Sequence, residues 1–280
     1  MSKPLNTAFV LGGGGRWGAV EVGMLRALSD AEIRPDVILG TSIGAFNGSI
    51  IADDPGTVGV ERLAAFWEEL SGADLFKSSV LGRVRNVATL QPAIHRSAEL
   101  QLVLEHIHGT YKRIEDLHIP FQCVAASIER ASEHWFTEGP LIPALLATAA
   151  VPVLFPPVEI EGQHFYDGGL VNSVPLTRAV DLGASTIYVL QVGRLEAPLR
   201  PPERLHEAAL ISFEIARRNR YATALEALPA DVDVHVLPSG NPVEFDDRRQ
   251  LRWRDTGDTT ILVDGAYSAS SDYLRENGLW

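Results

Sequence analysis

Residues 37–53 have the sequence VILGTSIGAFNGSIIAD, which predicts a strand, a tight turn and a helix in close succession. The apolar start is typical of a short buried strand, and the small and apolar residues at the end are typical of a closely packed helix. Between them, Gly40 and Gly44 flank Ser42 in the pattern G-x-S-x-G. Such a turn holds a serine in a strained conformation with its hydroxyl exposed at the carboxyl end of the strand. The pattern therefore predicts that Ser42 is a nucleophile; the alternative is an ordinary turn before a small-residue helix.

A glycine-rich loop precedes this unit. Residues 7–11 form an apolar run that predicts a strand, four glycines occupy 12–15, and apolar residues recur at helical spacing over 17–31. Strand, helix and strand in so short a stretch predict a right-handed parallel unit. The glycine loop and the Ser42 turn would then emerge at the same carboxyl edge of the sheet, where ligands bind.

The glycine loop is compatible with two kinds of ligand. Residues 13–18 match the pattern G-x-G-x-x-G, which is found in dinucleotide sites. Dinucleotide binding also needs an acidic residue at the end of the second strand, but Asp36 precedes that strand. We therefore rank a nicotinamide or flavin oxidoreductase last among the candidate functions. Consecutive glycines at the start of a helix instead leave backbone N–H groups available for an anion, such as the oxyanion of a tetrahedral intermediate.

A serine nucleophile requires a group that accepts its proton. His206 falls at the start of a predicted helix and His235 in the middle of a predicted strand, and we interpret both as solvated or structural. Asp167 is the better candidate, because Gly168 and Gly169 follow it and the chain then runs as a loop into a helix, not as the second strand of a hairpin. Apolar surroundings would raise the pKa of Asp167 from about 3.9 towards neutral pH.

Composition and charge exclude several classes of protein. The chain has 280 residues, a net charge of −12 and one cysteine, Cys123. The acidic balance argues against nucleic-acid binding, and a lone cysteine fits a reducing compartment. The uncharged segment 139–158 contains five prolines, so we interpret it as buried or pocket-lining rather than as a membrane span. Because the N-terminus does not resemble a signal peptide and no spacing suggests a metal site, we expect a cytoplasmic protein without metal or cofactor.

The remaining pattern predicts a single α/β domain over residues 1–280, with no internal repeat and no linker. The motifs fall in a core at 6–192, and a helix–strand–helix extension follows at 200–280. Periodicity is weak at 72–96. Predicted strands lie at 121–126, 186–191 and 232–237, a hairpin at 158–166, and helices at 60–70, 98–107, 140–149, from about 175, at 203–228 and at 259–277.

The glycine loop, the GTSIG turn and the downstream DGG together resemble the patatin-like phospholipase family, from about residue 8 to residue 191. The resemblance implies a three-layer α/β fold with a parallel-dominated central sheet and helices on both faces. It also implies a Ser42–Asp167 dyad that hydrolyses fatty acyl esters of lipids through an acyl-enzyme, with the backbone N–H groups of Gly13, Gly14 and Gly15 as the oxyanion hole. The supporting motif positions are Arg16, Gly18, Gly40, Gly44, Gly168 and Gly169.

One position departs from the family pattern. The family usually carries Arg or Lys where this chain has Trp17, and the arginine lies one place earlier, at Arg16. On a helix, this shift rotates the side chain by about 100°. We therefore expect Trp17 to favour an apolar acyl group or a neutral ester over a phospholipid.

The expected partner is a fatty acyl ester or phospholipid substrate, and the sequence leaves the oligomeric state open. Two alternatives remain: an acyltransferase that uses the same site, and a catalytically slow lipid-binding protein. Basic clusters at 217–221 and 248–254 could contact anionic lipid headgroups, with transient binding at the inner face of the membrane. The favoured interpretation of both clusters is a solvated helix face paired with carboxylates.

Overall fold

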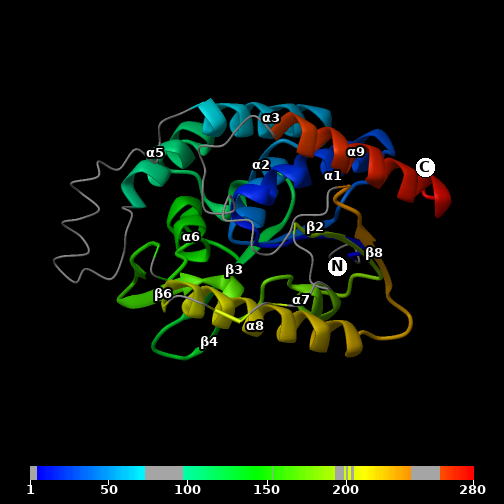
Figure 1. Cartoon of the computed structure of the whole chain (residues 1–280). Helices are drawn as coiled ribbons and strands as arrows, with labels where there is room; N and C mark the ends of the chain where they lie inside the picture. Colours follow the sequence, from blue (N-terminus) through cyan, green and yellow to red (C-terminus); the bar gives the residue numbers. More distant parts are fainter. Residues whose placement is uncertain are drawn as a thin grey trace.

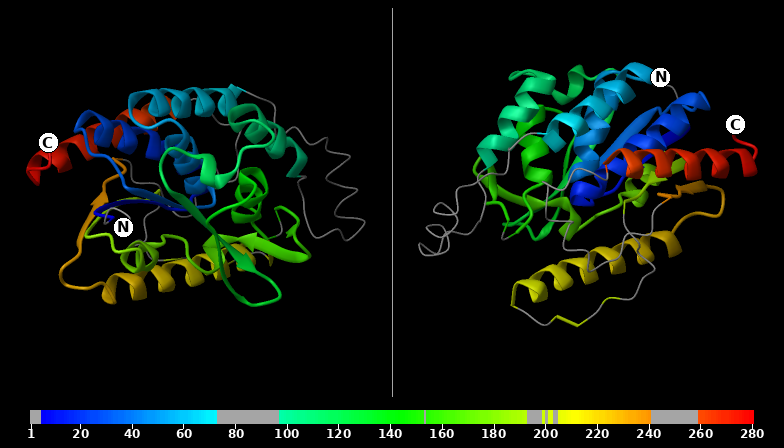
Figure 2. Two further views of the ribbon diagram at one scale, coloured as in Figure 1. Left: turned by 180° about the vertical axis from the view of Figure 1, so that it is seen from behind. Right: turned by 45° about the horizontal axis from the view of Figure 1, so that its top comes forward.

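The structure, a computed structural model, describes residues 5–72, 97–152, 154–192, 199, 201–202, 205–240 and 259–280. A central sheet separates two layers of helices (Figure 1). Helices α1 (Ala19–Asp30), α3 (Thr57–Gly72) and α9 (Thr259–Glu276) lie on one side of the sheet, and α7 (Leu176–Asp181) and α8 (Leu205–Glu226) on the other. The turned views in Figure 2 show the same separation of α8 from α9. The predicted α/β fold with helices on both faces is confirmed.

The sheet is mostly parallel. Its strand order is β5-β6-β3-β2-β1-β7-β8, with β4 paired to β3 outside this path. The neighbours from β3 to β8 run parallel, whereas β4, β5 and β6 add antiparallel pairs at one end. The bounds are β1 Thr7–Leu11, β2 Val37–Thr41, β3 Phe121–Ser127, β4 Ser132–Phe136, β5 Val158–Ile160, β6 Gln163–Asp167, β7 Thr186–Leu190 and β8 Asp233–Leu237.

Strand β1 contacts both helical layers. Phe9 and Leu11 belong to the larger core, which also contains residues of α1, α3 and α9. Ala8 and Val10 belong to the smaller core, which contains residues of α7 and α8. Because both faces of this central strand are buried, it appears in the sequence as a continuous apolar run rather than as an alternating one.

The helices α2 (Ile43–Asp53), α5 (Ser97–His108) and α6 (Leu141–Thr148) complete the layer of the larger core. Helix α6 lies in the uncharged segment, and its leucines are buried in this core, which confirms a buried rather than a membrane-spanning segment. Short 3₁₀ turns are η1 Gly15–Gly18, η2 Ile114–Asp116 and η3 Gly168–Leu170. Of the helices within the described ranges, none combines the length and apolar character needed to cross a membrane.

The predicted elements are present within a few residues of their expected bounds, and β4 is an additional strand. Its sequence, SEHWF, is too polar to suggest a strand, but it pairs antiparallel with residues 123–127 of β3. The C-terminal part adds β8 to the sheet beside β7, and α9 packs against α1. The division into a core and an extension remains a prediction.

Candidate active site

Ser42 lies at the junction of β2 and α2 in a strained backbone conformation. Its φ of 55° and ψ of −126° are unfavourable for a residue with a side chain. Gly44 allows this turn, because a Cβ at its position would lie only 2.5 Å from the carbonyl oxygen of Leu11. The helix α2 can therefore begin close against β1, and the Ser42 side chain is left at the carboxyl end of the sheet. This is the geometry that the G-x-S-x-G pattern predicts.

Thr148, the last residue of α6, holds the strained turn in place. The Ser42 backbone N–H donates to Thr148 Oγ1 at 3.0 Å, and the same hydroxyl donates to the carbonyl of Val124. All three groups are buried, so each hydrogen bond avoids an unsatisfied polar atom. Sequence reasoning missed this residue, although a threonine in an uncharged helix was a detectable signal.

Asp167 is the last residue of β6, and it reaches the same point of the sheet as Ser42. Along β3, Thr41 pairs with Val124 and Asp167 pairs with Ala125, the next residue. Strands β2 and β6 therefore end at consecutive register positions of one strand. The Asp-Gly sequence does not form a hairpin turn here, because the 3₁₀ turn η3 follows directly.

The Asp167 carboxyl group is almost completely buried, at 1% exposure. Burial raises its pKa from the usual 3.8 to about 6, while the Ser42 hydroxyl, the Gly169 N–H and the charge of Arg217 counteract the increase. Gly169 N–H donates to Oδ1 at 2.7 Å. Oδ2 of Asp167 forms no well-aligned hydrogen bond with any residue of the described ranges. The Ser42 hydroxyl therefore lowers the pKa of the carboxyl group without a well-aligned hydrogen bond to it.

The glycine loop passes directly beside the serine. A Cβ on Gly13 would lie 3.3 Å from the Cβ of Ser42. Gly13 N–H donates to the carbonyl of Ser173 at 3.1 Å, and is therefore occupied. Within the described part of the chain, the N–H groups of Gly14 and Gly15 have no acceptor. Of the three predicted oxyanion donors, these two are available to a ligand.

The residues after Asp167 connect the site motifs. The Thr41 hydroxyl donates to the carbonyl of Asn172 at 2.9 Å, and Ser173 accepts from Gly13 as described above. The loop after DGG thus holds both the strand that precedes Ser42 and the glycine loop. These contacts explain why three motifs far apart in the sequence meet at one edge of the sheet.

Arg217 of α8 also reaches the glycine loop, which the sequence did not predict. Its Nη1 donates to the carbonyl of Gly13 at 3.1 Å and to the Ser173 hydroxyl at 3.4 Å. Arg217 pairs with Glu214 at 2.9 Å, as the carboxylate-pairing interpretation of its cluster predicted. However, Arg217 is only 8% exposed, so the prediction of a solvated side chain is wrong at this position. The cluster at 248–254 lies outside the described residues.

The side chain of Arg16 lies outside the described part of the chain, whereas that of Trp17 is described. Trp17 is 6% exposed and packs within the larger core. The structure therefore gives no support to the expectation that Trp17 selects an apolar substrate, and it identifies Trp17 as a core residue.

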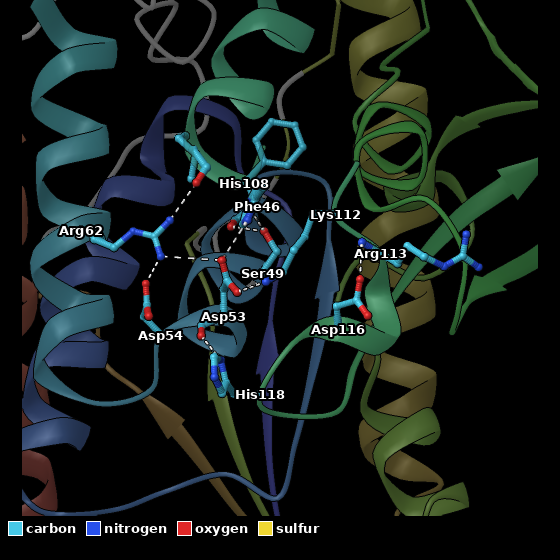
Figure 3. Close-up of polar contacts among 11 residues, drawn as sticks. Phe46, Ser49, Asp53, Asp54, Arg62, His108, Lys112, Arg113, Asp116 and His118 are labelled. Carbon is cyan, nitrogen blue, oxygen red and sulfur yellow. Dashed lines mark hydrogen bonds and ion pairs between the residues drawn. The ribbon is translucent and has the colours of Figure 1, made fainter. Parts of the chain in front are cut away.

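A second serine, histidine and aspartate lie together at the far end of α2 (Figure 3). Ser49 Oγ is 3.0 Å from His108 Nε2, and His108 Nδ1 is 3.6 Å from Asp53 Oδ2. Ser49 is fully buried within α2, and its hydroxyl donates to the Phe46 carbonyl, so this serine is not placed to attack a substrate. Lys112 completes an ion cluster around Asp53. We interpret this group as a structural link between α2 and the end of α5 with the residues that follow it.

Other sequence candidates have structural roles. The ring of His235 in β8 stacks on Tyr188 at 5.0 Å, which confirms the structural interpretation. Cys123 is buried within β3, and burial raises the pKa of its thiol. The described residues contain no group of three or more His, Cys, Asp or Glu side chains that could hold a metal ion. The side chain of His206 lies outside the described residues.

Comparison with known proteins identifies relatives that share one family description. The sequence model of the patatin-like phospholipase family matches residues 9–180. A patatin-like phospholipase domain-containing protein of Caenorhabditis elegans is 33% identical over 189 residues, which are 67% of this chain and 14% of that protein. The lysophospholipase nte1 of Aspergillus terreus is 29% identical over 205 residues, which are 68% of this chain and 12% of that protein. The matched region is thus a small part of these longer relatives.

A solved structure shows the same fold. The human GIVD cytosolic phospholipase A2, in complex with methyl gamma-linolenyl fluorophosphonate, aligns with a TM-score of 0.54 at 12% sequence identity. The alignment covers 99% of this chain and 58% of that one.

Proposed function

The chain belongs to the patatin-like phospholipase family, and from this premise we propose that it is a lipid acyl hydrolase with Ser42 as the nucleophile and Asp167 as the general base. One observation carries the proposal: a buried carboxyl group with a pKa of about 6 lies beside a serine hydroxyl in a strained turn. A base of this pKa is largely ionised at neutral pH and still binds a proton well enough to remove it from the serine.

The proposed reaction has two steps. Ser42 Oγ attacks the carbonyl carbon of the ester while Asp167 takes the hydroxyl proton, and a tetrahedral oxyanion forms. The intermediate collapses to an acyl-enzyme, and Asp167 returns the proton to the leaving alcohol. In the second step, Asp167 takes a proton from water, and the resulting hydroxide oxygen attacks the acyl carbonyl. The second tetrahedral intermediate collapses to the fatty acid, and Asp167 gives the proton to Ser42 Oγ, which restores both groups.

We propose Gly14 and Gly15 as the principal oxyanion donors. Their N–H groups lie on the loop beside Ser42 and lack acceptors among the described residues, whereas the N–H of Gly13 is held by Ser173. The role of Gly13 is then to bring the loop close to the serine. An oxyanion donor of this kind typically contributes about 10²–10³ in rate.

The substrate class that we propose is a fatty acyl ester, with phospholipids and lysophospholipids included. The family match and the named lysophospholipase relative support this class. Because Trp17 lies in the core, it gives no reason to exclude charged headgroups. We retain the cytoplasm as the proposed compartment and contact with a membrane surface as part of substrate capture.

The proposed dyad can be tested with a fluorophosphonate probe and intact-mass measurement. Wild type and the control Ser49→Ala should each gain one adduct, because Ser49 is buried in the ion cluster of Figure 3. Ser42→Ala should gain none, and Asp167→Asn should react far more slowly. If the folded wild-type protein gains no adduct, this result would contradict the proposed hydrolase function and favour the alternative of a lipid-binding protein.

Product analysis then separates hydrolysis from acyl transfer. Incubation of the enzyme with a fatty acyl ester and increasing glycerol should yield free fatty acid as the main product. If the acyl group passes mainly to glycerol, the acyltransferase alternative replaces the hydrolase.

A further inference from the structure

Helix α8 packs against η3, the turn that follows Asp167, although the helix lies beyond the residues that match the family model. Phe213 of this helix packs against the turn after Asp167, since a Cβ on Gly169 would lie 2.7 Å from the tip of the Phe213 ring. One turn further along the helix, the buried side chain of Arg217 extends to the glycine loop.

The guanidinium group of Arg217 makes polar contacts with three residues. Nη1 donates to the Gly13 carbonyl and to the Ser173 hydroxyl, at 3.1 and 3.4 Å. Nη2 donates to Glu214 at 2.9 Å, which fixes the guanidinium in the plane of these contacts. Ser173 in turn accepts the N–H of Gly13 through its carbonyl. Arg217 and Ser173 therefore hold both polar groups of Gly13.

We propose that Arg217 is a positioning residue of the hydrolase, which orients the oxyanion loop through the Gly13 carbonyl and supplies a buried positive charge to the site. The inference rests on the proposed function and extends it to a residue outside the family motifs.

The first part follows from peptide geometry. No peptide bond of the described chain is cis, and in a planar trans peptide the carbonyl and the following N–H point in opposite directions. An arginine that holds the Gly13 carbonyl therefore also fixes the direction of the Gly14 N–H, one of the two proposed oxyanion donors. Without this contact, the glycine loop would be free to rotate the peptide, because glycine has few steric restrictions.

The second part follows from charge. Three groups lower the pKa of Asp167 against the effect of burial: the Ser42 hydroxyl, the Gly169 N–H and the charge of Arg217. Arg217 is the one that carries a formal charge. Glu214, the partner of Arg217, is the opposing charge on the same helix. Loss of the guanidinium should therefore leave Asp167 protonated at higher pH, so that it accepts the Ser42 proton less readily.

The test uses three variants of the whole chain. Arg217→Met removes the charge and the donors but retains the length of the side chain. Arg217→Lys retains the charge but cannot reach the three acceptors together. Arg218→Met is the matched control, because Arg218 pairs with the same Glu214. Circular dichroism confirms folding, and the rate of fluorophosphonate labelling is measured from pH 5 to pH 9.

The two parts of the proposal predict separate effects. Arg217→Met should lower the labelling rate at pH 8.5 by about 10- to 100-fold, somewhat less than complete loss of an oxyanion donor. It should also move the midpoint of the acidic limb to a higher pH than in wild type, where we expect it near pH 6. Arg217→Lys should retain the wild-type limb with an intermediate rate, and Arg218→Met should match wild type.

Several outcomes would overturn the inference. An unchanged labelling rate of Arg217→Met at pH 8.5 would refute the orienting role of Arg217. An acidic limb that is unchanged in Arg217→Met, or shifted equally in Arg217→Lys, would refute the role of its charge. A wild-type protein without labelling would instead contradict the proposed function. In that case, NMR titration of ¹³C-labelled Asp167 still decides the electrostatic part: its pKa must rise in Arg217→Met, and an unchanged pKa refutes it.

Discussion

Replacement of Asp167 by asparagine should stabilise the protein at neutral pH while it removes the proposed base. Burial raises the pKa of this carboxyl group from 3.8 to about 6. Each pH unit of this difference corresponds to about 1.4 kcal/mol, so the ionised carboxylate costs roughly 3 kcal/mol of folding free energy at pH 7. Asparagine carries no charge, and its side-chain oxygen can still accept the N–H of Gly169. We therefore expect Asp167→Asn to raise the free energy of unfolding by up to about 3 kcal/mol at pH 7.

The sign of the pH dependence is a sharper test than the magnitude. Because the folded-state pKa is raised, Asp167 favours folding most below its unfolded value of 3.8, and this contribution is lost as the pH rises through about 6. The advantage of Asp167→Asn should therefore shrink to about 1 kcal/mol at pH 4.5. Urea unfolding of wild type and variant at pH 7 and pH 4.5 measures both values.

A matched control separates this effect from a general change in charge. Asp264→Asn removes a carboxylate that is 66% exposed on α9, and its effect on stability should not depend on pH in this way. The reasoning is refuted if Asp167→Asn destabilises the protein at pH 7, or if its stability advantage is equal at the two pH values.

Three further predictions concern the surroundings of Ser42 and the ion cluster at the far end of α2. Gly44→Ala places a methyl group 2.5 Å from the Leu11 carbonyl oxygen. This overpacking should lower the free energy of unfolding by about 1–3 kcal/mol and slow labelling. An unchanged melting temperature and labelling rate would contradict the close approach of α2 to β1. Thr148→Val removes the acceptor of the Ser42 N–H and should lower the free energy of unfolding by about 1–3 kcal/mol. Thr148→Ser should behave as wild type in urea unfolding and labelling. Equal losses in the two variants would show that the hydroxyl does not hold the turn. His108 and then Lys112 lower the pKa of Asp53, so its stabilising contribution is present above the usual 3.8 and is lost as pH falls. Asp53→Asn should thus be less stable than wild type at pH 7. The difference in free energy of unfolding, measured with urea, should become smaller below pH 4, and a difference that does not change with pH would refute this reasoning.

The sequence was sufficient to predict the elements that carry the motifs. Strands β1, β2 and β7 are short apolar runs buried on both faces, and glycine-rich turns mark the carboxyl ends of β1 and β2. The local pattern of glycine and serine also predicted the strained turn at Ser42. Strand β4 was missed because its polar residues belong to an antiparallel strand with partial exposure, where hydrophobic alternation is weak.

The contacts that hold the site together could not be predicted in the same way. Arg217 contacts Gly13 across 204 positions of sequence, and Thr148 contacts Ser42 across 106. Neither local propensity nor periodicity describes such pairs, because they depend on which face of a helix meets the sheet. The arginine-rich sequence around 217 is typical of a solvated helix face, and only the packing of α8 shows that one of its cations is buried.

Three carboxyl groups differ in their environments, and the differences favour Asp167 for the proposed role of general base. Glu21 is fully buried on α1, and burial raises its pKa well above 4.5 although Asn47 donates a hydrogen bond to it. Asp53 has the opposite environment, because His108 and Lys112 keep its carboxylate ionised.

A general base must both accept and return a proton near neutral pH, which requires a pKa close to that range. Glu21 holds its proton too firmly, and Asp53 binds one too weakly. Asp167 lies between them, because desolvation is partly offset by Ser42, Gly169 and Arg217. The Gly169 N–H also holds Oδ1 of Asp167 in place, so the position of the carboxyl group and its proton affinity have a common structural origin in this contact.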